Sequence, residues 1–409
     1  MATTVDKPLA VRALNRVGAA LGRVGMQPSL DPDDLERAAV RATGLGDFGE
    51  GSFREGLERL TASLQDEARL TTIGRIAART RLKTLLETRL RLVDHRRVNP
   101  EVAHERIEQP IFVLGLPRTG TTVLYGLLAA DERMRSPASW EVARPFPPPR
   151  SQDRATDRRI AATDREFDQF RKVAPGIDRI HPLGAQLPQE CLALQAPEFA
   201  SYEFPTTFPV PSYWEWLRDQ DLRRAYAFQK SFLQHLQSGY GGEHWILKTP
   251  AHLMWLETLL AVFPDALIIQ THRDPATVLA SVSSLMYALR SSVSDHVDPH
   301  DVGREQLDAW TWGLRRTLRA REQLPAQRVV DVRFQDTVND PVGTVARIYE
   351  HFGLTMTDAV EQGVRTYLGE NPRTKHGVHR YDLADFGIDP DEAEDAFAFY
   401  REHFDVDEE

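Results

Sequence analysis

One short segment constrains the fold of this chain more than any other, because it joins an apolar run to a glycine-bounded loop and a helical pattern. The run Ile111–Leu114 leads into Gly115-Leu116-Pro117-Arg118-Thr119-Gly120-Thr121-Thr122, and apolar residues at helical spacing follow. The two glycines are spaced as in the phosphate-binding pattern G-x-x-x-x-G-K-[ST]. A strand, a tight loop and a helix N-terminus in this order direct backbone N–H groups and the helix dipole at an anion. The segment predicts a phosphate- or sulfate-binding loop, and a glycine-containing turn without a ligand is the alternative.

Three further apolar runs are each followed by a helical pattern. The runs are Trp245–Lys248, Ala266–His272 and Val329–Val332, and the helices after them begin at Thr249-Pro250, Asp274-Pro275 and Asp340-Pro341. Asp or Thr before Pro is typical of a capped first helical turn. Repeated alternation of apolar strands and helices predicts a parallel sheet covered by helices, which binds ligands at the carboxyl ends of its strands. We therefore expect an α/β fold with a P-loop-type parallel sheet flanked by helices.

Composition predicts how the rest of the chain is organised. Residues 1–105 read as an N-terminal helical region, with a helix start at Asp31 and apolar residues at helical spacing from Phe53 to about Val93. Residues 106–409 are expected to form the α/β domain. Within it, residues from about 140 to 240 form an insertion rich in proline and aromatic residues. This insertion is interpreted either as a lid that binds the acceptor or as a part of the packed core.

Charge and cysteine content exclude several classes of protein. The 409 residues carry a formal charge of −10, but ten acidic residues and one arginine fall between Asp389 and Glu409, so the body is nearly neutral and 389–409 reads as an acidic tail. This balance argues against a nucleic-acid partner, which requires a basic face. The single cysteine, Cys191, excludes an intramolecular disulfide and a cysteine-based zinc cluster. We expect a cytoplasmic location.

The N-terminal segment 8–26 is compatible with a weak basic amphipathic helix, because Leu14, Val17, Leu21 and Val24 would fall on one side of it. No run approaches the ~20 apolar residues that span a bilayer, so no transmembrane segment is expected. Packing against the protein and contact with a membrane surface are both open for this helix.

Two motifs resemble the sulfotransferases that use 3′-phosphoadenylyl sulfate. Pro-Arg-Thr-Gly-Thr-Thr is similar to the 5′-phosphosulfate loop, which reads Pro-Lys-Ser-Gly-Thr-Thr in cytosolic members of that family. The resemblance implies that this loop binds the sulfuryl donor through Pro117, Arg118, Thr119, Gly120, Thr121 and Thr122. A second family element is an arginine at a strand end with a serine eight residues later, here Arg273 and Ser281, which implies a grip on the 3′-phosphate.

Two further segments carry the same resemblance. Phe334-Gln335-Asp336 with Asn339-Asp340-Pro341 is similar to the family's Tyr-Glu-Asp…Asp-Pro segment, with phenylalanine in place of tyrosine. Arg373-Thr374-Lys375-His376-Gly377 is similar to a basic loop that implies Arg373 and Lys375 as further 3′-phosphate ligands. The resemblance spans about residues 110–400 and is greatest to a bacterial branch with an N-terminal helical region.

The resemblance also implies the chemistry. Sulfuryl transfer resembles phosphoryl transfer without a metal: the protein positions both reactants, stabilises the charge on the phosphate leaving group and removes the acceptor's proton. Arg118 and the loop amides would stabilise that charge, with help from Lys248 at a strand end. Glu141 and His252 are both candidates for the base, and each has an alternative structural interpretation. His181 and Glu190 form a second polar pair near the acceptor on one interpretation and a structural pair on the other.

We therefore expect a metal-free sulfotransferase that acts on a hydroxyl or amine of a small molecule, lipid or glycan. A P-loop kinase is one alternative, although Thr121 stands where a kinase needs lysine. A non-catalytic nucleotide-binding protein on the same fold is another. The identity of the acceptor and the oligomeric state, including a homo-oligomer, stay open.

Overall fold

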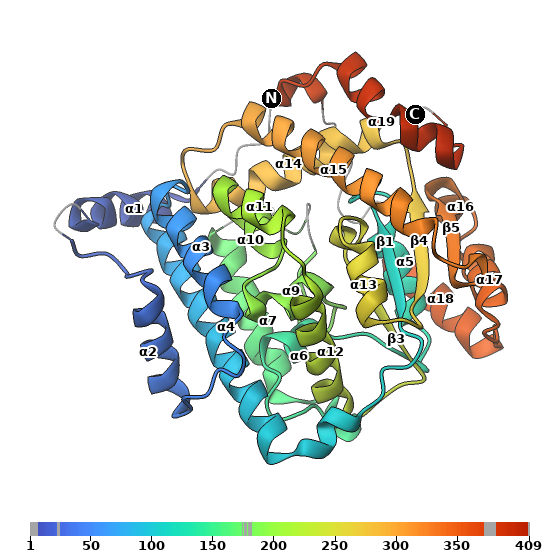
Figure 1. The fold of residues 1–409 in the computed structure, drawn as a ribbon, viewed down its shortest axis with the longest axis horizontal. Coiled ribbons are helices and arrows are strands. Elements are labelled where there is room, and N and C mark those ends of the chain that lie inside the picture. The colour runs from blue at the N-terminus through green and yellow to red at the C-terminus, as the bar shows by residue number, and fades with distance from the viewer. Residues whose placement is uncertain are drawn as a thin grey trace.

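The computed structural model describes residues 7–22, 25–173, 175, 178, 182–371 and 382–407, and it contains a five-stranded parallel sheet with helices on both faces (Figure 1). The strand order is β2-β3-β1-β4-β5, and every neighbouring pair is parallel. The strands are β1 (Ile111–Gly115), β2 (Met134–Arg135), β3 (His244–Lys248), β4 (Leu267–His272) and β5 (Val329–Arg333). The prediction of a parallel sheet flanked by helices is therefore confirmed.

Helices surround this sheet and make up most of the remaining chain (Figure 1). Before the sheet come α1 (Leu9–Gly22), α2 (Pro32–Thr43), α3 (Phe53–Asp66) and α4 (Thr72–Val98). Between β1 and β3 lie α5 (Thr121–Ala129), α6 (Ser139–Ala143), α7 (Arg158–Val173), α9 (Cys191–Gln195), α10 (Glu203–Thr207), α11 (Pro211–Arg218) and α12 (Arg223–Gln237). After β3 come α13 (Leu256–Val262), α14 (Pro275–Val293), α15 (Pro299–Arg321), α16 (Phe334–Asn339), α17 (Pro341–Phe352), α18 (Asp358–Glu370) and α19 (Pro390–Phe404).

The two faces of the sheet are covered by different helices. Side chains alternate along a strand, so Phe112 and Leu114 of β1 face one side while Ile111 and Val113 face the other. Phe112 and Leu114 belong to a large apolar core that also contains leucines of α2, α3 and α4. Ile111 and Val113 belong to a smaller core with α5, α17 and α18. Helices α2, α3 and α4 thus share one core with the sheet.

The start signals read from the sequence mark real helix ends. The side chains of Asp31, Asp274 and Asp340 accept hydrogen bonds from the first-turn N–H groups of α2, α14 and α17. After Thr249 the chain forms a short 3₁₀ turn, Pro250–Leu253, before α13 begins. The apolar stretch that starts at Phe53 is two helices, α3 and α4, because Thr71 caps a new helix through its bond to Gly74 N.

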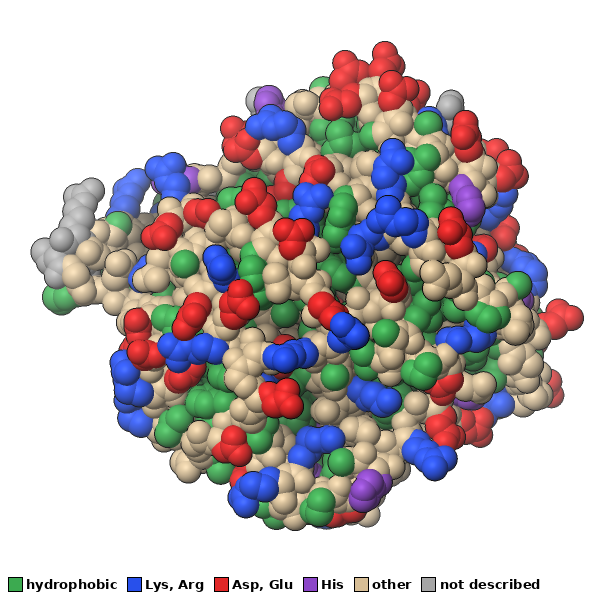
Figure 2. Space-filling view, in the orientation of Figure 1, with side chains coloured by type: hydrophobic (Ala, Val, Ile, Leu, Met, Phe, Trp, Pro, Cys, Tyr) green, Lys and Arg blue, Asp and Glu red, His purple; other side chains and the backbone are tan. Residues whose placement is uncertain are grey.

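The acidic C-terminal segment is largely helical. Helix α19 buries Ala393, Phe397 and Tyr400 against the main core and keeps its carboxylates outside. Figure 2 shows acidic side chains gathered over this part of the molecule. The Tyr400 hydroxyl lies 2.8 Å from His272 Nδ1, so the segment is attached to the carboxyl end of β4.

Candidate active site

The glycine-bounded loop turns sharply from β1 into α5. Gly115, Arg118 and Gly120 have φ angles of +152°, +71° and +84°, a region that non-glycine residues seldom adopt. A Cβ on Gly115 would lie 2.1 Å from Thr271 Oγ1, so only glycine allows the loop to pass this close to β4. Arg118 adopts the left-handed conformation without being glycine, and its side chain is exposed. The loop therefore presents a cation beside the first turn of α5, whose N–H groups have no partner within the helix.

Two threonines attach the loop to the neighbouring strand. Thr119 Oγ1 lies 2.7 Å from the Leu116 carbonyl oxygen and 2.6 Å from Thr271 Oγ1, and all these groups are buried. Thr271 was not singled out from the sequence. The available signal was a polar residue within the apolar strand β4, which pairs with Gly115 in the sheet.

Lys248 reaches the loop from the end of β3. Its side chain is buried, and its Nζ donates to Thr122 Oγ1 at 3.2 Å. The same Nζ forms an ion pair with Glu190, and Thr249 Oγ1 donates to the other carboxylate oxygen at 3.1 Å. Glu190 directly precedes α9 in the insertion. The structure thus brings a cation, a carboxylate and the N-terminal turn of α5 together, although nothing in the sequence near Glu190 specifies this contact.

Arg273 lies against the loop from the end of β4. Its Nη1 is 3.4 Å from the Arg118 carbonyl oxygen, and its guanidinium carbon is 4.4 Å from the centre of the Phe334 ring. Phe334, which stands in the family's tyrosine position, therefore supports Arg273 by stacking.

Ser281, the second residue predicted for the 3′-phosphate, is half-buried on α14, the helix that follows Arg273. Arg373 and Lys375, like His181, lie outside the described residues.

Glu141 is fully buried within α6. Its carboxylate pairs with Arg135 at 3.0 Å and accepts hydrogen bonds from the Tyr240 hydroxyl at 2.8 Å and the Ala138 N–H at 2.9 Å. Glu141 thus forms a buried ion pair with Arg135 and also binds the N–H group at the start of its own helix. The assignment of Glu141 as the base stays a prediction, and this geometry favours a structural role.

His252 is also fully buried, on the 3₁₀ turn after β3. Its Nδ1 lies 2.8 Å from the Tyr226 hydroxyl, and its ring meets Phe112 edge-on. Burial lowers the pKa of His252 to about 3, because the charged imidazolium loses its hydration. A neutral histidine in this position packs the core, and its role as the base likewise stays a prediction.

The aromatic residues of the insertion pack the core. Phe199, Phe204 and Tyr213 are buried completely, and Trp214 contacts Trp255 and Trp312 edge-on. These side chains do not form an open acceptor surface. A lid built from other residues of the insertion stays a prediction.

The described residues were also considered as metal ligands and as membrane-spanning segments. Among them, no group of three or more His, Cys, Asp and Glu side chains is arranged to hold a metal ion. None of their helices is both long enough and apolar enough to cross a bilayer.

Several known proteins are similar to this chain in sequence or in fold. The chain is 27% identical over 282 residues to omega-hydroxy-beta-dihydromenaquinone-9 sulfotransferase Stf3 of Mycobacterium bovis, covering 64% of this chain and 68% of that protein. The crystal structure of sulfotransferase STF1 from Mycobacterium tuberculosis H37Rv matches with 34% identity and a TM-score of 0.81, covering 90% of this chain and 98% of that one. That of sulfotransferase STF9 from Mycobacterium avium matches with 31% identity and a TM-score of 0.84, covering 92% and 97%.

A family model described as the sulfotransferase family matches residues 110–358, which contain the loop, Glu190, Lys248 and Arg273. Both the sequence motifs and the fold agree with this match. The chain belongs to the sulfotransferase family.

Proposed function

We propose that this protein transfers a sulfuryl group from 3′-phosphoadenylyl sulfate to a hydroxyl group of a lipid-like acceptor. The observation that carries the proposal is Lys248, held between Thr122 of the loop and the Glu190 carboxylate. This contact supports the proposal because a cation and a carboxylate lie beside the first turn of α5, whose N–H groups could bind an anion. The lipid-like acceptor is suggested by the relative that is named a dihydromenaquinone sulfotransferase.

The two ends of the sulfuryl donor would be held by different elements. Arg118, the first-turn N–H groups of α5 and Lys248 would surround the 5′-phosphosulfate. Arg273 and Ser281 would hold the 3′-phosphate, together with Arg373 and Lys375 from outside the described residues. Charged groups suit this role because charge-assisted hydrogen bonds to phosphate are roughly twice as strong as neutral ones.

We infer that Glu190 is the general base. A base must come within hydrogen-bonding reach of the acceptor's proton, and Glu190 lies beside the loop where sulfur would be held. The acceptor oxygen would bond to sulfur as the bond from sulfur to the phosphate oxygen breaks. The proton would pass to Glu190, and Arg118 and Lys248 would stabilise the negative charge on the departing nucleotide.

A label-transfer experiment tests this proposal. The purified chain is incubated with donor carrying radioactive sulfur and an ω-hydroxylated prenyl quinol, in the presence of EDTA. We expect label in the lipid, loss of transfer in Lys248→Met, and normal transfer in Lys83→Met, which changes a partly exposed lysine of α4. Transfer of the γ-phosphate of ATP that EDTA abolishes would contradict the proposal and favour a kinase. Donor binding without turnover over a broad acceptor panel would also contradict it and indicate a non-catalytic binding protein.

A further inference from the structure

Helix α1 contacts the rest of the protein through a narrow face that carries Val11, Asn15 and Gly18. The Asn15 side-chain oxygen accepts a hydrogen bond from Ile73 N at 3.1 Å, and its carbonyl oxygen accepts one from Thr72 Oγ1 at 3.3 Å. Gly18 lies so close to α4 that an added Cβ would be 2.3 Å from the Thr72 side chain. The helix is thus attached by a narrow strip containing Asn15 and Gly18.

The apolar face of α1 points away from the protein. Leu9, Leu14 and Val17 are 81%, 50% and 59% exposed, and Ala10 and Ala13 are exposed with them. At 100° per residue these five side chains fall within about 140° of the helix circumference. A surface helix normally buries such a face against its own core, so this one is available to another apolar phase.

Cations border the exposed apolar face. Between Asp6 and Asp31 the sequence has Lys7, Arg12, Arg16 and Arg23 and no carboxylate. Arg12 and Arg16 are exposed and lie on the helix edge next to Leu9. Figure 2 shows Lys and Arg side chains at this end of the molecule.

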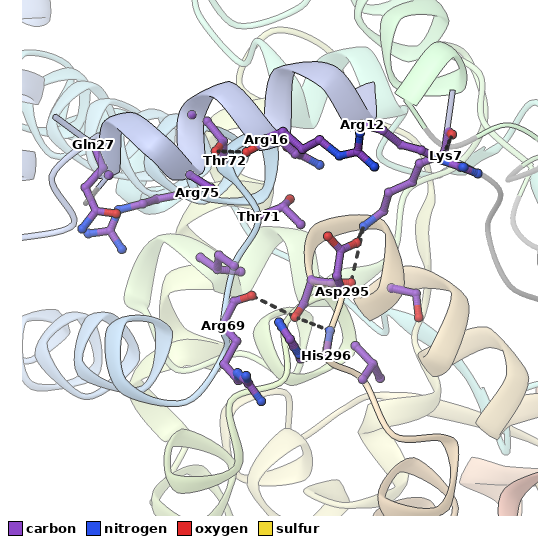
Figure 3. Close-up of a pocket in the computed structure, with 18 of the residues that line it drawn as sticks. Lys7, Arg12, Arg16, Gln27, Arg69, Thr71, Thr72, Arg75, Asp295 and His296 are labelled. Carbon is purple, nitrogen blue, oxygen red and sulfur yellow. Dashed lines mark hydrogen bonds and ion pairs between the residues drawn. The ribbon is translucent and has the colours of Figure 1, made fainter. Parts of the chain in front are cut away.

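A cationic cavity lies beneath the same helix (Figure 3). Its volume is about 790 Å³, and its lining includes five cationic residues, Lys7, Arg12, Arg16, Arg69 and Arg75. Asp295 is the carboxylate in this lining, and it pairs with Lys7 at 2.6 Å. Positive charge is therefore concentrated here although the chain as a whole carries −10.

We propose that the exposed face of α1 binds the surface of a bilayer that contains anionic phospholipids, and that the cations beneath the helix add to the positive potential at this end of the protein. Leu9, Leu14 and Val17 would enter the boundary between headgroups and acyl chains, and Arg12 and Arg16 would contact lipid phosphates. An apolar face bordered by arginines is the pattern of helices that lie in the plane of a membrane interface. The acidic C-terminal segment 389–409 would be repelled by the same surface, so the protein would bind in one orientation. This function is separate from sulfuryl transfer.

Vesicle flotation tests the proposal with the full chain and no substrate. The probes are phosphatidylcholine vesicles with and without phosphatidylglycerol. We expect binding to the anionic vesicles, weakened by added salt. Val17→Ser and Arg16→Glu should each weaken binding by about tenfold. Val98→Ser and Arg97→Glu are matched controls at the far end of α4, where both side chains are exposed, and should bind as the wild type does.

Two results would overturn the proposal. One is equal flotation of the wild type and the α1 variants. The other is no flotation together with a dimer in sedimentation that Val17→Ser dissociates, because the face would then bind a second copy of the chain. Circular dichroism checks that each variant is folded. Since the assay contains neither sulfuryl donor nor acceptor, its failure leaves the proposed reaction untouched.

Discussion

At the scale of single residues, two glutamates each pair with a buried cation but lie at different places in the fold. Glu141 is enclosed by Arg135, Tyr240 and the start of its own helix. Glu190 contacts Lys248 and Thr249 at the carboxyl end of the sheet. Replacing a buried, ion-paired carboxylate leaves the charge of its partner uncompensated. Replacing a general base instead removes the group that accepts the proton. These two roles respond differently to the same substitution.

We predict that Glu190→Gln lowers the single-turnover rate at saturating donor by ~10²–10⁴. Glu141→Gln should instead lower the free energy of unfolding by about 3 kcal/mol, because Arg135 loses its charged partner in the interior. Rapid-quench kinetics and urea unfolding measure the two effects. A fast Glu190→Gln enzyme beside a folded, inactive Glu141→Gln enzyme would reverse our assignment.

Arg118 gives a second prediction at this scale. Arg118→Ala should reduce kcat more than it weakens donor binding, because charge on the leaving phosphate develops fully only in the transition state. We expect a loss of about 10²-fold in kcat. A change in kcat of less than about twofold would contradict the role of Arg118, because it is far smaller than the loss expected for a charge-stabilising group.

Some of these residues could be predicted from the sequence because the sheet itself brings them together. The carboxyl ends of parallel strands meet at one edge, which places Lys248 and Arg273 beside the loop. Glu190 reaches the same edge from an insertion, through a contact that no local pattern encodes. The burial of His252 could not be predicted either, because it depends on the 3₁₀ turn that directs the ring toward Phe112.

At the scale of elements, close backbone contacts at glycines fix how the helices pack. The first turn of α4 meets the last turn of α14 at Gly74, where an added Cβ would lie 2.0 Å from the Val293 carbonyl oxygen. At the same contact, Thr71 N donates a hydrogen bond to the Val293 carbonyl oxygen at 2.9 Å. Rigid backbone atoms on both sides leave no room for even one methyl group.

We predict that Gly74→Ala lowers the free energy of unfolding by about 1–3 kcal/mol, because the backbones must separate. Gly369→Ala is the matched control. It lies within α18 with nothing near its Cβ position, so the substitution should stabilise the helix by roughly 0.5–1 kcal/mol. Thermal unfolding monitored by circular dichroism measures both. Similar melting temperatures for the two variants would argue against this helix contact.

The element boundaries show where sequence reasoning succeeds. Capping side chains act locally, so the starts of α2, α14 and α17 could be read directly from Asp-Pro pairs. Helical periodicity alone could not separate α3 from α4, because apolar residues continue at similar spacing on both sides of the break. The acidic composition of the C-terminal segment likewise gave no indication that α19 packs against the protein. Its few buried aromatic residues are enough to attach it to the core.

At the scale of the whole molecule, buried histidines couple stability to pH. Burial lowers the pKa of His252 to about 3 and that of His235 to about 4, from an ordinary value of 6.5. Between these values the unfolded chain binds protons that the folded chain does not. The stability that these groups contribute is complete above pH 6.5 and declines as the pH falls toward the folded values.

We predict that acidification from pH 7 to pH 5 lowers the free energy of unfolding, with His252 alone contributing about 2 kcal/mol. His252→Asn should make this pH dependence shallower, whatever it does to stability at pH 7. His104→Asn, at an exposed histidine, should leave the slope unchanged. Urea unfolding across this pH range checks both, and equal slopes in all three proteins would contradict the expectation.

The distribution of charge over the whole molecule is compatible with the proposed binding of an anionic nucleotide by an acidic chain. The C-terminal segment supplies most of the net charge, while Arg118, Lys248 and Arg273 surround one helix N-terminus. Binding of the 3′-phosphate would distinguish the proposed sulfuryl donor from ATP, and Arg273 is the described cation assigned to it.

Titration calorimetry of 3′-phosphoadenosine 5′-phosphate and of ADP, each in EDTA, tests this central claim most directly. We predict that the wild-type protein binds 3′-phosphoadenosine 5′-phosphate far more tightly than ADP. Arg273→Ala should weaken binding of 3′-phosphoadenosine 5′-phosphate by about 1.5–3 kcal/mol and hardly change binding of ADP. Equal affinity of the wild-type protein for the two nucleotides would contradict the account.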